Sequence, residues 1–223
     1  MKTPIFLATA LLILPGVSTA ATLANYAFAN GPNTLPTVNG VTATAISYGS
    51  GLGTPQTSAA TFGPSGASAL GLVTASAAPT TIPAAVSANS FFTFTLTSSP
   101  GTSFLLTDFT FWANYSGDTT AANELALQID TGSGYQTIGT STFNVTGSAA
   151  PGKMYTIPIN NPAPVDGSAH FRIVMFDSAG INWTSFTRMD DLSVNGTVIP
   201  EPSAWLLMLC VGGLVPLHRR RSH

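Results

Sequence analysis

Paired carboxylates are the first chemistry to test in this sequence. Glycoside hydrolysis needs two carboxyl groups about 5–10 Å apart. Glu124 and Asp130 share one face of a predicted strand, but six residues at about 3.3 Å each separate them by about 20 Å. Asp190 and Asp191 are adjacent, so on a strand they point to opposite faces. Folding could bring together carboxylates that are distant in sequence, but the sequence itself predicts no glycosidase or lyase site.

A second chemical signal is the tetrapeptide Asp-Thr-Gly-Ser at residues 130–133, which matches the loop of aspartic proteases. That reaction needs two carboxylates sharing a proton, and the other candidate, Asp-Ser-Ala-Gly at residues 177–180, breaks the motif. Strand-like residues flank the first loop, so a β-hairpin turn explains it. His170 is the only histidine of the central part, and no Gly-x-Ser-x-Gly motif accompanies it, which disfavours a histidine metal cluster and a serine triad.

Three aspartates could instead hold a cation. Asp108, Asp190 and Asp191, with backbone oxygens, offer the hard oxygen ligands that calcium prefers, so a structural calcium ion at these residues is one interpretation. Aspartates at turns or on the surface are the alternative interpretation.

Sugar binding is predicted from aromatic residues, because sugar rings stack on flat apolar faces. The four candidates are Trp112, Tyr115, Tyr135 and Trp183, and Trp183 lies in the most loop-like stretch. Core packing is the usual role of such rings. Thr93, Thr95 and Thr97 would form a row like those of ice-binding surfaces, although an ordinary solvent-facing strand explains a single row equally well.

Alternation of apolar and polar residues predicts the elements that carry these groups. Residues 92–97, 125–129 and 192–195 alternate strictly, and residues 171–176 are apolar on both faces, as in a central strand. Further strands are predicted at residues 41–47, 70–74, 104–112, 135–139 and 154–159, with Gly- and Pro-rich turns between them. We therefore predict an all-β fold: one antiparallel, jelly-roll-like β-sandwich at residues 21–198, rich in loops at residues 49–88.

Charge excludes some partners. Charged residues make up only 7% of the 223 residues, and the formal net charge is −2, so no basic surface for nucleic acid is expected. The one cysteine, Cys210, lies near the C-terminus, so the sandwich contains no disulfide.

The N-terminus is predicted to be a secretory signal peptide, residues 1–20. Lys2 precedes an apolar run at residues 5–14, and small residues at positions 18 and 20 predict cleavage after Ala20.

The C-terminal segment, residues 199–223, has three parts. Pro200, Glu201 and Pro202 cannot continue a helix, residues 204–217 form an apolar stretch, and Arg219, Arg220 and Arg221 follow it. We predict a single hydrophobic transmembrane helix of about 21 Å, short for a bilayer core of about 30 Å.

This three-part tail resembles the PEP-CTERM sorting signal of Gram-negative bacteria, a type of tail also found at the C-termini of some ice-binding proteins. The resemblance implies that an exosortase, a membrane protease-transpeptidase, recognises and cuts the tail. It also implies a passage through the inner membrane to the cell surface or the exopolysaccharide matrix. A plain membrane anchor is the alternative.

Together these patterns predict an exported, non-enzymatic surface or matrix protein without a cofactor, sorted by its tail. The alternative function is a carbohydrate-binding module for exopolysaccharide, which exposed aromatic residues on a sheet face would distinguish.

Overall fold

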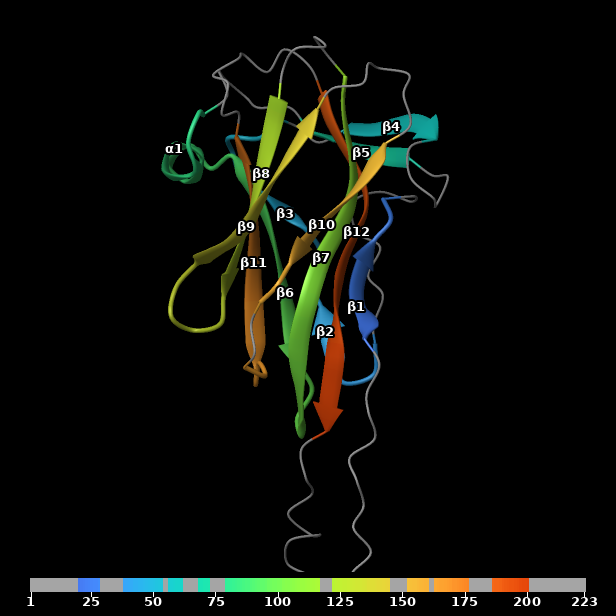
Figure 1. The fold of residues 1–223 in the computed structure, drawn as a ribbon, viewed down its shortest axis with the longest axis vertical. Coiled ribbons are helices and arrows are strands. Elements are labelled where there is room, and N and C mark those ends of the chain that lie inside the picture. Colours follow the sequence, from blue (N-terminus) through green and yellow to red (C-terminus); the bar gives the residue numbers. More distant parts are fainter. Residues whose placement is uncertain are drawn as a thin grey trace, which may run out of the picture.

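The strands predicted from alternation lie in two antiparallel sheets packed face to face (Figure 1). The computed structural model describes residues 20–28, 38–53, 56–61, 68–72, 79–116, 122–144, 152–160, 163–176 and 186–200. Residues 1–19 of the predicted signal peptide and residues 201–223 of the predicted tail lie outside this range. Within it, no helix is both long and apolar enough to cross a membrane.

One sheet, which we name the β7 sheet, has the order β10-β7-β12-β5-β4, and β1 also pairs with β12. Its strands are β1 (Ala21–Tyr26), β4 (Gln56–Thr61), β5 (Ser68–Leu72), β7 (Thr102–Ser116), β10 (Lys153–Pro158) and β12 (Phe186–Pro200). The other, the β11 sheet, has the order β2-β6-β11-β8-β9, and β3 also pairs with β6. Its strands are β2 (Val41–Ala43), β3 (Ser47–Tyr48), β6 (Phe91–Ser98), β8 (Ala122–Asp130), β9 (Gln136–Asn144) and β11 (Ser168–Phe176).

The main strands follow the order of a jelly roll. β1-β12-β7-β10 form one layer and β6-β11-β8-β9 the other, so the chain crosses repeatedly between the two layers. The prediction of one antiparallel, jelly-roll-like sandwich is therefore confirmed.

Aromatic side chains from both sheets fill the space between the layers. The rings of Phe94 and Phe171 stack with centroids 4.7 Å apart, and the Tyr26 ring lies 5.1 Å from Phe94. The largest fully buried side chains are Tyr26, Phe28, Phe92, Phe94, Phe104, Phe109, Phe111, Phe171 and Leu23. Burial of these rings is the main apolar contribution to the stability of the sandwich.

The stretch predicted to be rich in loops, residues 49–88, contains regular structure: β4, β5 and the short helix α1 (Ile82–Ser87). Thr81 caps α1, because its hydroxyl accepts a hydrogen bond from the Ala84 amide at 3.4 Å. Pro83 lies in the first turn, where a proline costs no hydrogen bond.

Candidate functional site

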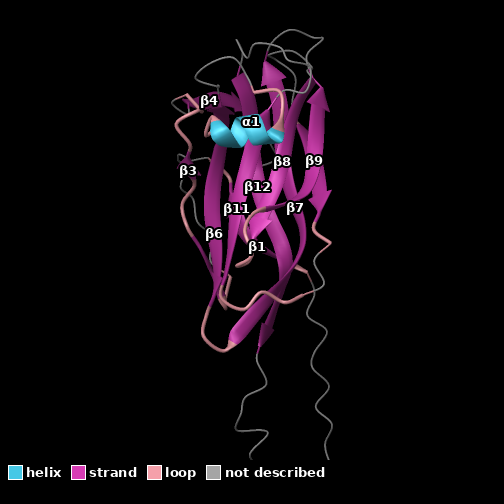
Figure 2. Ribbon diagram, turned by 90° about the vertical axis from the view of Figure 1, so that its left-hand side faces the viewer, coloured by secondary structure: helices cyan, strands magenta, loops and turns pink. Residues whose placement is uncertain are grey.

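The outer face of the β11 sheet is divided into an apolar end and a polar remainder. At the apolar end α1 lies across the strands (Figure 2), and Ala85 packs against Ala126, Val174 and Phe176. The Ser90 hydroxyl donates to the Met175 carbonyl at 3.0 Å and so anchors the segment that follows the helix. The helix therefore closes one end of the face and leaves the rest open.

The open remainder carries polar side chains from four neighbouring strands, and we name it the polar face. It follows from the alternation in β6. Phe92, Phe94 and Leu96 turn inward and are buried, while the threonines between them point outward and are half-buried. The members of the polar face are Thr93, Thr95, Gln128, Asp130, Thr137, His170 and Arg172.

Cross-strand pairing sets these side chains in rows perpendicular to the strands. Arg172 lies opposite Thr93 on one side and Gln128 on the other, and Gln128 lies opposite Thr137. The Arg172 Nε donates to Gln128 Oε1 at 2.7 Å, and Gln128 Nε2 donates to Thr137 Oγ1 at 3.0 Å. Four strands about 4.8 Å apart give this row a length of about 14 Å.

A second row lies beside the first. His170 pairs with Thr95 on β6 and with Asp130 on β8, and the Thr95 Oγ1 and His170 Nδ1 atoms are 3.0 Å apart. Hydrogen bonding within the rows reduces the rotamer freedom of these side chains before any ligand arrives.

Arg172 lies at the centre of the polar face, between two rings. Its guanidinium carbon is 4.0 Å from the Tyr135 ring centroid and 5.3 Å from that of Phe91. Its Nε already donates to Gln128, and among the described residues no group accepts from its two terminal amino groups. The arrangement is a positioned fork of donors, which suits planar or paired acceptors.

The turn after β8 positions Tyr135. Asp130 Oδ1 accepts hydrogen bonds from the amides of Gly132 at 2.7 Å and Gly134 at 2.9 Å. Both glycines have positive φ angles, 113° and 90°, which are sterically unfavourable for residues with a side chain. The bond from Gly132 is the largest cause that holds the pKa of Asp130 below its usual value, and His170 adds to it. The Asp-Thr-Gly-Ser motif is therefore a hairpin turn, as predicted.

Burial raises the pKa of Tyr135, while the charge of Arg172 lowers it and that of Asp130 raises it. The phenol therefore stays neutral and can donate a hydrogen bond at neutral pH. The turn thus brings a ring, a carboxylate and a guanidinium into one neighbourhood.

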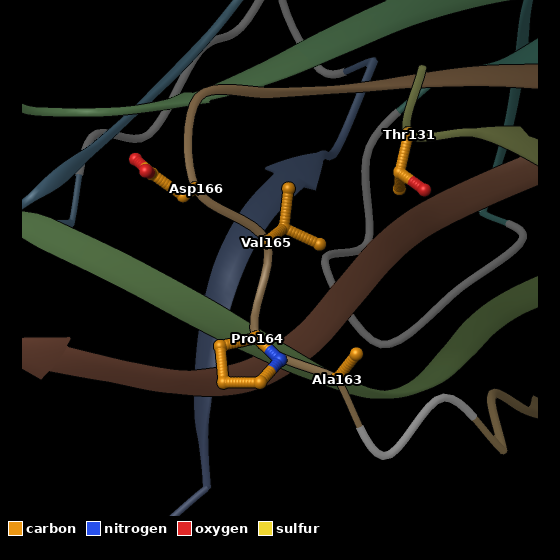
Figure 3. A pocket seen from close by; sticks show the side chains of 5 residues that line it. All are labelled: Thr131, Ala163, Pro164, Val165 and Asp166. Atoms are coloured by element: carbon orange, nitrogen blue, oxygen red, sulfur yellow. The ribbon is translucent and has the colours of Figure 1, made fainter. Parts of the chain in front are cut away.

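A cavity of about 320 Å³ lies beyond Asp130, where Thr131 meets the segment before β11 (Figure 3). It is lined by Thr131, Ala163, Pro164, Val165 and Asp166. Asp166 and Thr131 lie on opposite sides of Val165 in this view. Among the described residues that line the cavity there is one carboxylate and no aromatic ring, so these residues offer neither an acid–base pair nor a stacking platform.

The carboxylates tested as a pair remain far apart. Glu124 and Asp130 both lie on β8, six residues apart on one face, which keeps the separation of about 20 Å inferred from the sequence. Asp190 is fully buried on β12, and its Oδ1 accepts from the Asp191 amide at 2.9 Å. Asp191 is half-buried in a β-bulge with φ 47°.

The predicted calcium ligands do not form one cluster. Asp108 lies on β7 opposite Asn195, and its Oδ1 accepts a hydrogen bond from the side-chain Nδ2 of Asn195 at 2.7 Å. Asp190 lies opposite Trp112, four residues and about 13 Å further along β7. Among the described residues no group of three or more His, Cys, Asp or Glu side chains could hold a metal ion. Calcium binding stays a prediction for a smaller ligand set around Asp190 and Asp191.

The predicted aromatic platform is divided between the sheets. Trp112 and Tyr115 belong to β7, whereas Tyr135 follows β8 in the β11 sheet. Trp183 lies outside the described residues. Sequence reasoning named Tyr135 but missed Arg172, since no motif marks a lone arginine in a strand; only the register shows its neighbours.

The processing residues lie at the limits of the described chain. Ala20 is exposed and directly precedes β1, and Pro200 is the exposed last residue of β12, opposite Thr102. Glu201, Pro202, Arg219, Arg220 and Arg221 lie outside the described residues. The sheet thus includes two residues, 199 and 200, that were predicted to belong to the tail.

No known protein family matches the chain, and no curated protein does. Several solved structures are similar at low identity. A xylan-binding CBM22-1 domain from Paenibacillus barcinonensis is 9% identical, with a TM-score of 0.44 over 82% of this chain and 98% of that domain. A carbohydrate-binding module, TmCBM61, in complex with β-1,4-galactotriose is 14% identical, with a TM-score of 0.38 over 79% and 99%. The CBM22-1 and GH10 modules of a Clostridium thermocellum endo-1,4-β-D-xylanase, in complex with xylohexaose, are 10% identical, with a TM-score of 0.42; the match covers 79% of this chain and 28% of that one.

Proposed function

We propose that this protein is an exported, non-catalytic β-sandwich that binds glycans on the polar face of its β11 sheet. The observation that carries the proposal is Arg172, held between the rings of Tyr135 and Phe91 with its terminal amino groups directed to no described acceptor. A fixed guanidinium beside aromatic and hydroxyl groups is suited to polyhydroxylated ligands.

The surroundings of Arg172 supply complementary groups. Gln128, His170 and the threonine hydroxyls offer both donors and acceptors, and Asp130 offers a charged acceptor. Sugar hydroxyls need both kinds of partner. The row of about 14 Å is long enough to contact an extended oligosaccharide rather than a single ring.

A binding role suits the carboxylates better than hydrolysis does. Glu124 and Asp130 lie about 20 Å apart on β8, well beyond the 5–10 Å at which two carboxyl groups cooperate in glycoside cleavage. One oxygen of Asp130, Oδ1, accepts hydrogen bonds from the turn amides of Gly132 and Gly134, and these bonds stabilise the carboxylate rather than the protonated acid that glycoside cleavage also needs.

The test uses the full chain, purified in mild detergent, against a set of immobilised polysaccharides. The set contains xylan, hydroxyethylcellulose, carboxymethylcellulose, methyl-esterified and saponified homogalacturonan, and the exopolysaccharide of the producing bacterium. We expect Arg172→Ala to weaken binding at least tenfold, because a hydrogen bond from a charged group contributes about 1.5–3 kcal/mol.

The matched control is Lys153→Ala. It removes the same charge and a cation that also lies over a ring, that of Tyr155 at 5.7 Å, but on the other sheet. Equal binding by the wild type and Arg172→Ala, or no binding of any polysaccharide by the wild type, would contradict the proposal.

We further propose that the tail delivers this domain to the cell surface or matrix through an exosortase. Pro200, Glu201, Pro202, the apolar residues 204–217 and Arg219–Arg221 support this proposal by their resemblance to a PEP-CTERM signal. Mass spectrometry of protein from the host should find an N-terminus at Ala21 and a shortened C-terminus. Replacing residues 200–202 by alanines should block the C-terminal cut, and equal processing of both proteins would refute the assignment.

A further inference from the structure

The charges beside Arg172 restrict the kind of glycan that the polar face can bind. Arg172 is the only Lys or Arg among the described residues of the β11 sheet; Lys153 and Arg188 belong to the β7 sheet. Register places Asp130 diagonally across from Arg172, because Gln128 lies opposite Arg172 and Asp130 is two residues further along β8. Diagonal neighbours lie about 7–8 Å apart, and their Cβ atoms are somewhat closer.

Both charges of this pair persist at neutral pH. Hydrogen bonds from Gly132 and Gly134 hold the pKa of Asp130 below its usual value, and arginine does not lose its proton in proteins. The centre of the polar face is therefore zwitterionic rather than cationic.

Apart from Arg172 and His170, no described residue of the polar face can carry a positive charge, and the segment around the face is acidic. Residues 22–199 contain three Lys or Arg and eight Asp or Glu, so this segment has a net charge of 3 − 8 = −5. Consider a polyanionic glycan with one carboxylate bound at Arg172. Its neighbouring carboxylates would be repelled by Asp130 and by the negative net charge of the domain.

We propose that the polar face selects uncharged glycans, with Arg172 and Asp130 as the residues that determine this specificity. This inference rests on the proposed function and names its ligand class. Arg172 donates to a neighbouring pair of sugar hydroxyls through its terminal amino groups, and Asp130 accepts from hydroxyls on the adjacent ring. A hydroxyl can serve both residues because it donates and accepts, whereas a carboxylate only accepts and meets repulsion at Asp130.

The experiment uses the full chain in mild detergent and compares polymers that share a backbone and differ in whether the substituent carries a charged carboxylate. The pairs are methyl-esterified and saponified homogalacturonan, hydroxyethyl- and carboxymethylcellulose, and the exopolysaccharide of the producing bacterium before and after reduction of its carboxyl groups. We expect the uncharged member of each pair to bind about tenfold more tightly at low salt. Added salt should reduce this difference in affinity, because it screens the repulsion between the polymer's carboxylates and the acidic protein.

A substitution tests the residue assignment. Asp130→Asn keeps an oxygen that can accept from the turn amides but removes the charge, so binding of the carboxylated members should rise about threefold or more. Glu124→Gln removes the same charge from the same strand and face about 20 Å away, beyond the Debye length of about 8 Å at physiological salt, and should leave the preference unchanged.

The outcomes separate this inference from the proposed function. Equal or tighter binding of the carboxylated members through Arg172 overturns the inference and leaves glycan binding intact. An unchanged preference in Asp130→Asn removes Asp130 as a determinant. Binding of no member by the wild type refutes the proposed function and the inference together.

Discussion

Replacing Ile173 by Asp tests the register on which the whole site depends. Ile173 lies in β11 between β6 and β8, opposite Phe92 and Leu127, and has no exposed surface. Its neighbour Arg172 points to the polar face. A shift of one residue in the register would exchange these two positions and dismantle the site.

The cost of the substitution follows from this burial. Losing a fully buried isoleucine side chain costs about 1.5–3 kcal/mol. An uncompensated charge in the core costs about 3–5 kcal/mol more. The sum of about 5–8 kcal/mol is comparable to the whole unfolding free energy of a typical domain, about 5–15 kcal/mol. We therefore expect Ile173→Asp to prevent stable folding.

Urea unfolding followed by far-UV circular dichroism measures this cost, with or without reductant, because the sandwich contains no cysteine. Ile173→Val should lower the unfolding free energy by about 0.5–1.5 kcal/mol. Thr140→Asp, at an exposed position of β9, should change it by about 0.5 kcal/mol or less. A cooperative Ile173→Asp variant within about 1 kcal/mol of the wild type would refute the register.

Three further predictions concern the site and the aspartates. Because the pKa of Asp130 is lowered, its charged form stabilises the folded state at pH values above the ordinary pKa of 3.8. This contribution to the free energy of unfolding is lost as the pH falls through the lowered pKa. In Asp130→Asn the free energy of unfolding should not show that loss on acidification. Tyr135→Phe should retain glycan affinity better than Tyr135→Ala in the same binding assay, because a ring against Arg172 contributes about 1 kcal/mol. If calcium binds near Asp191, a chelator should lower the melting temperature of the wild type but not of Asp191→Asn; identical curves for the wild type would end the calcium hypothesis.

The alternation of apolar and polar residues predicted strands such as β6 and β11, which pair with their neighbours without a bulge. Residues 92–97 and 171–176 fall within β6 and β11, because each face of these strands meets one kind of environment. β1 escaped prediction, since a bulge between Thr22 and Ala24 breaks the two-residue period and buries consecutive residues. Bulges also interrupt β12, which extends well beyond the predicted residues 192–195.

The site was less accessible to sequence reasoning. The turn at residues 130–134 was predicted, because Asp-x-Gly-x-Gly specifies a hairpin locally. The contact between Tyr135 and Arg172 depends on β11 pairing with β8, an arrangement between segments distant in sequence that no local pattern encodes. A ring and a cation on separate strands look like an ordinary core residue and an ordinary surface residue until the register joins them.

The placement of the chain ends bears on how binding and attachment combine. Ala21 pairs with Gly196, and Pro200 pairs with Thr102, so the predicted signal-peptide cut and the start of the proposed sorting signal both adjoin the β7 sheet. The polar face belongs to the other layer, the β11 sheet, and lies on the side of that sheet away from the core. A domain held through Pro200 would thus be attached by one sheet and present the residues proposed to bind glycans on the opposite sheet. Attachment and binding then use separate surfaces, so blocking the C-terminal cut should change where the protein accumulates without changing its affinity for polysaccharide.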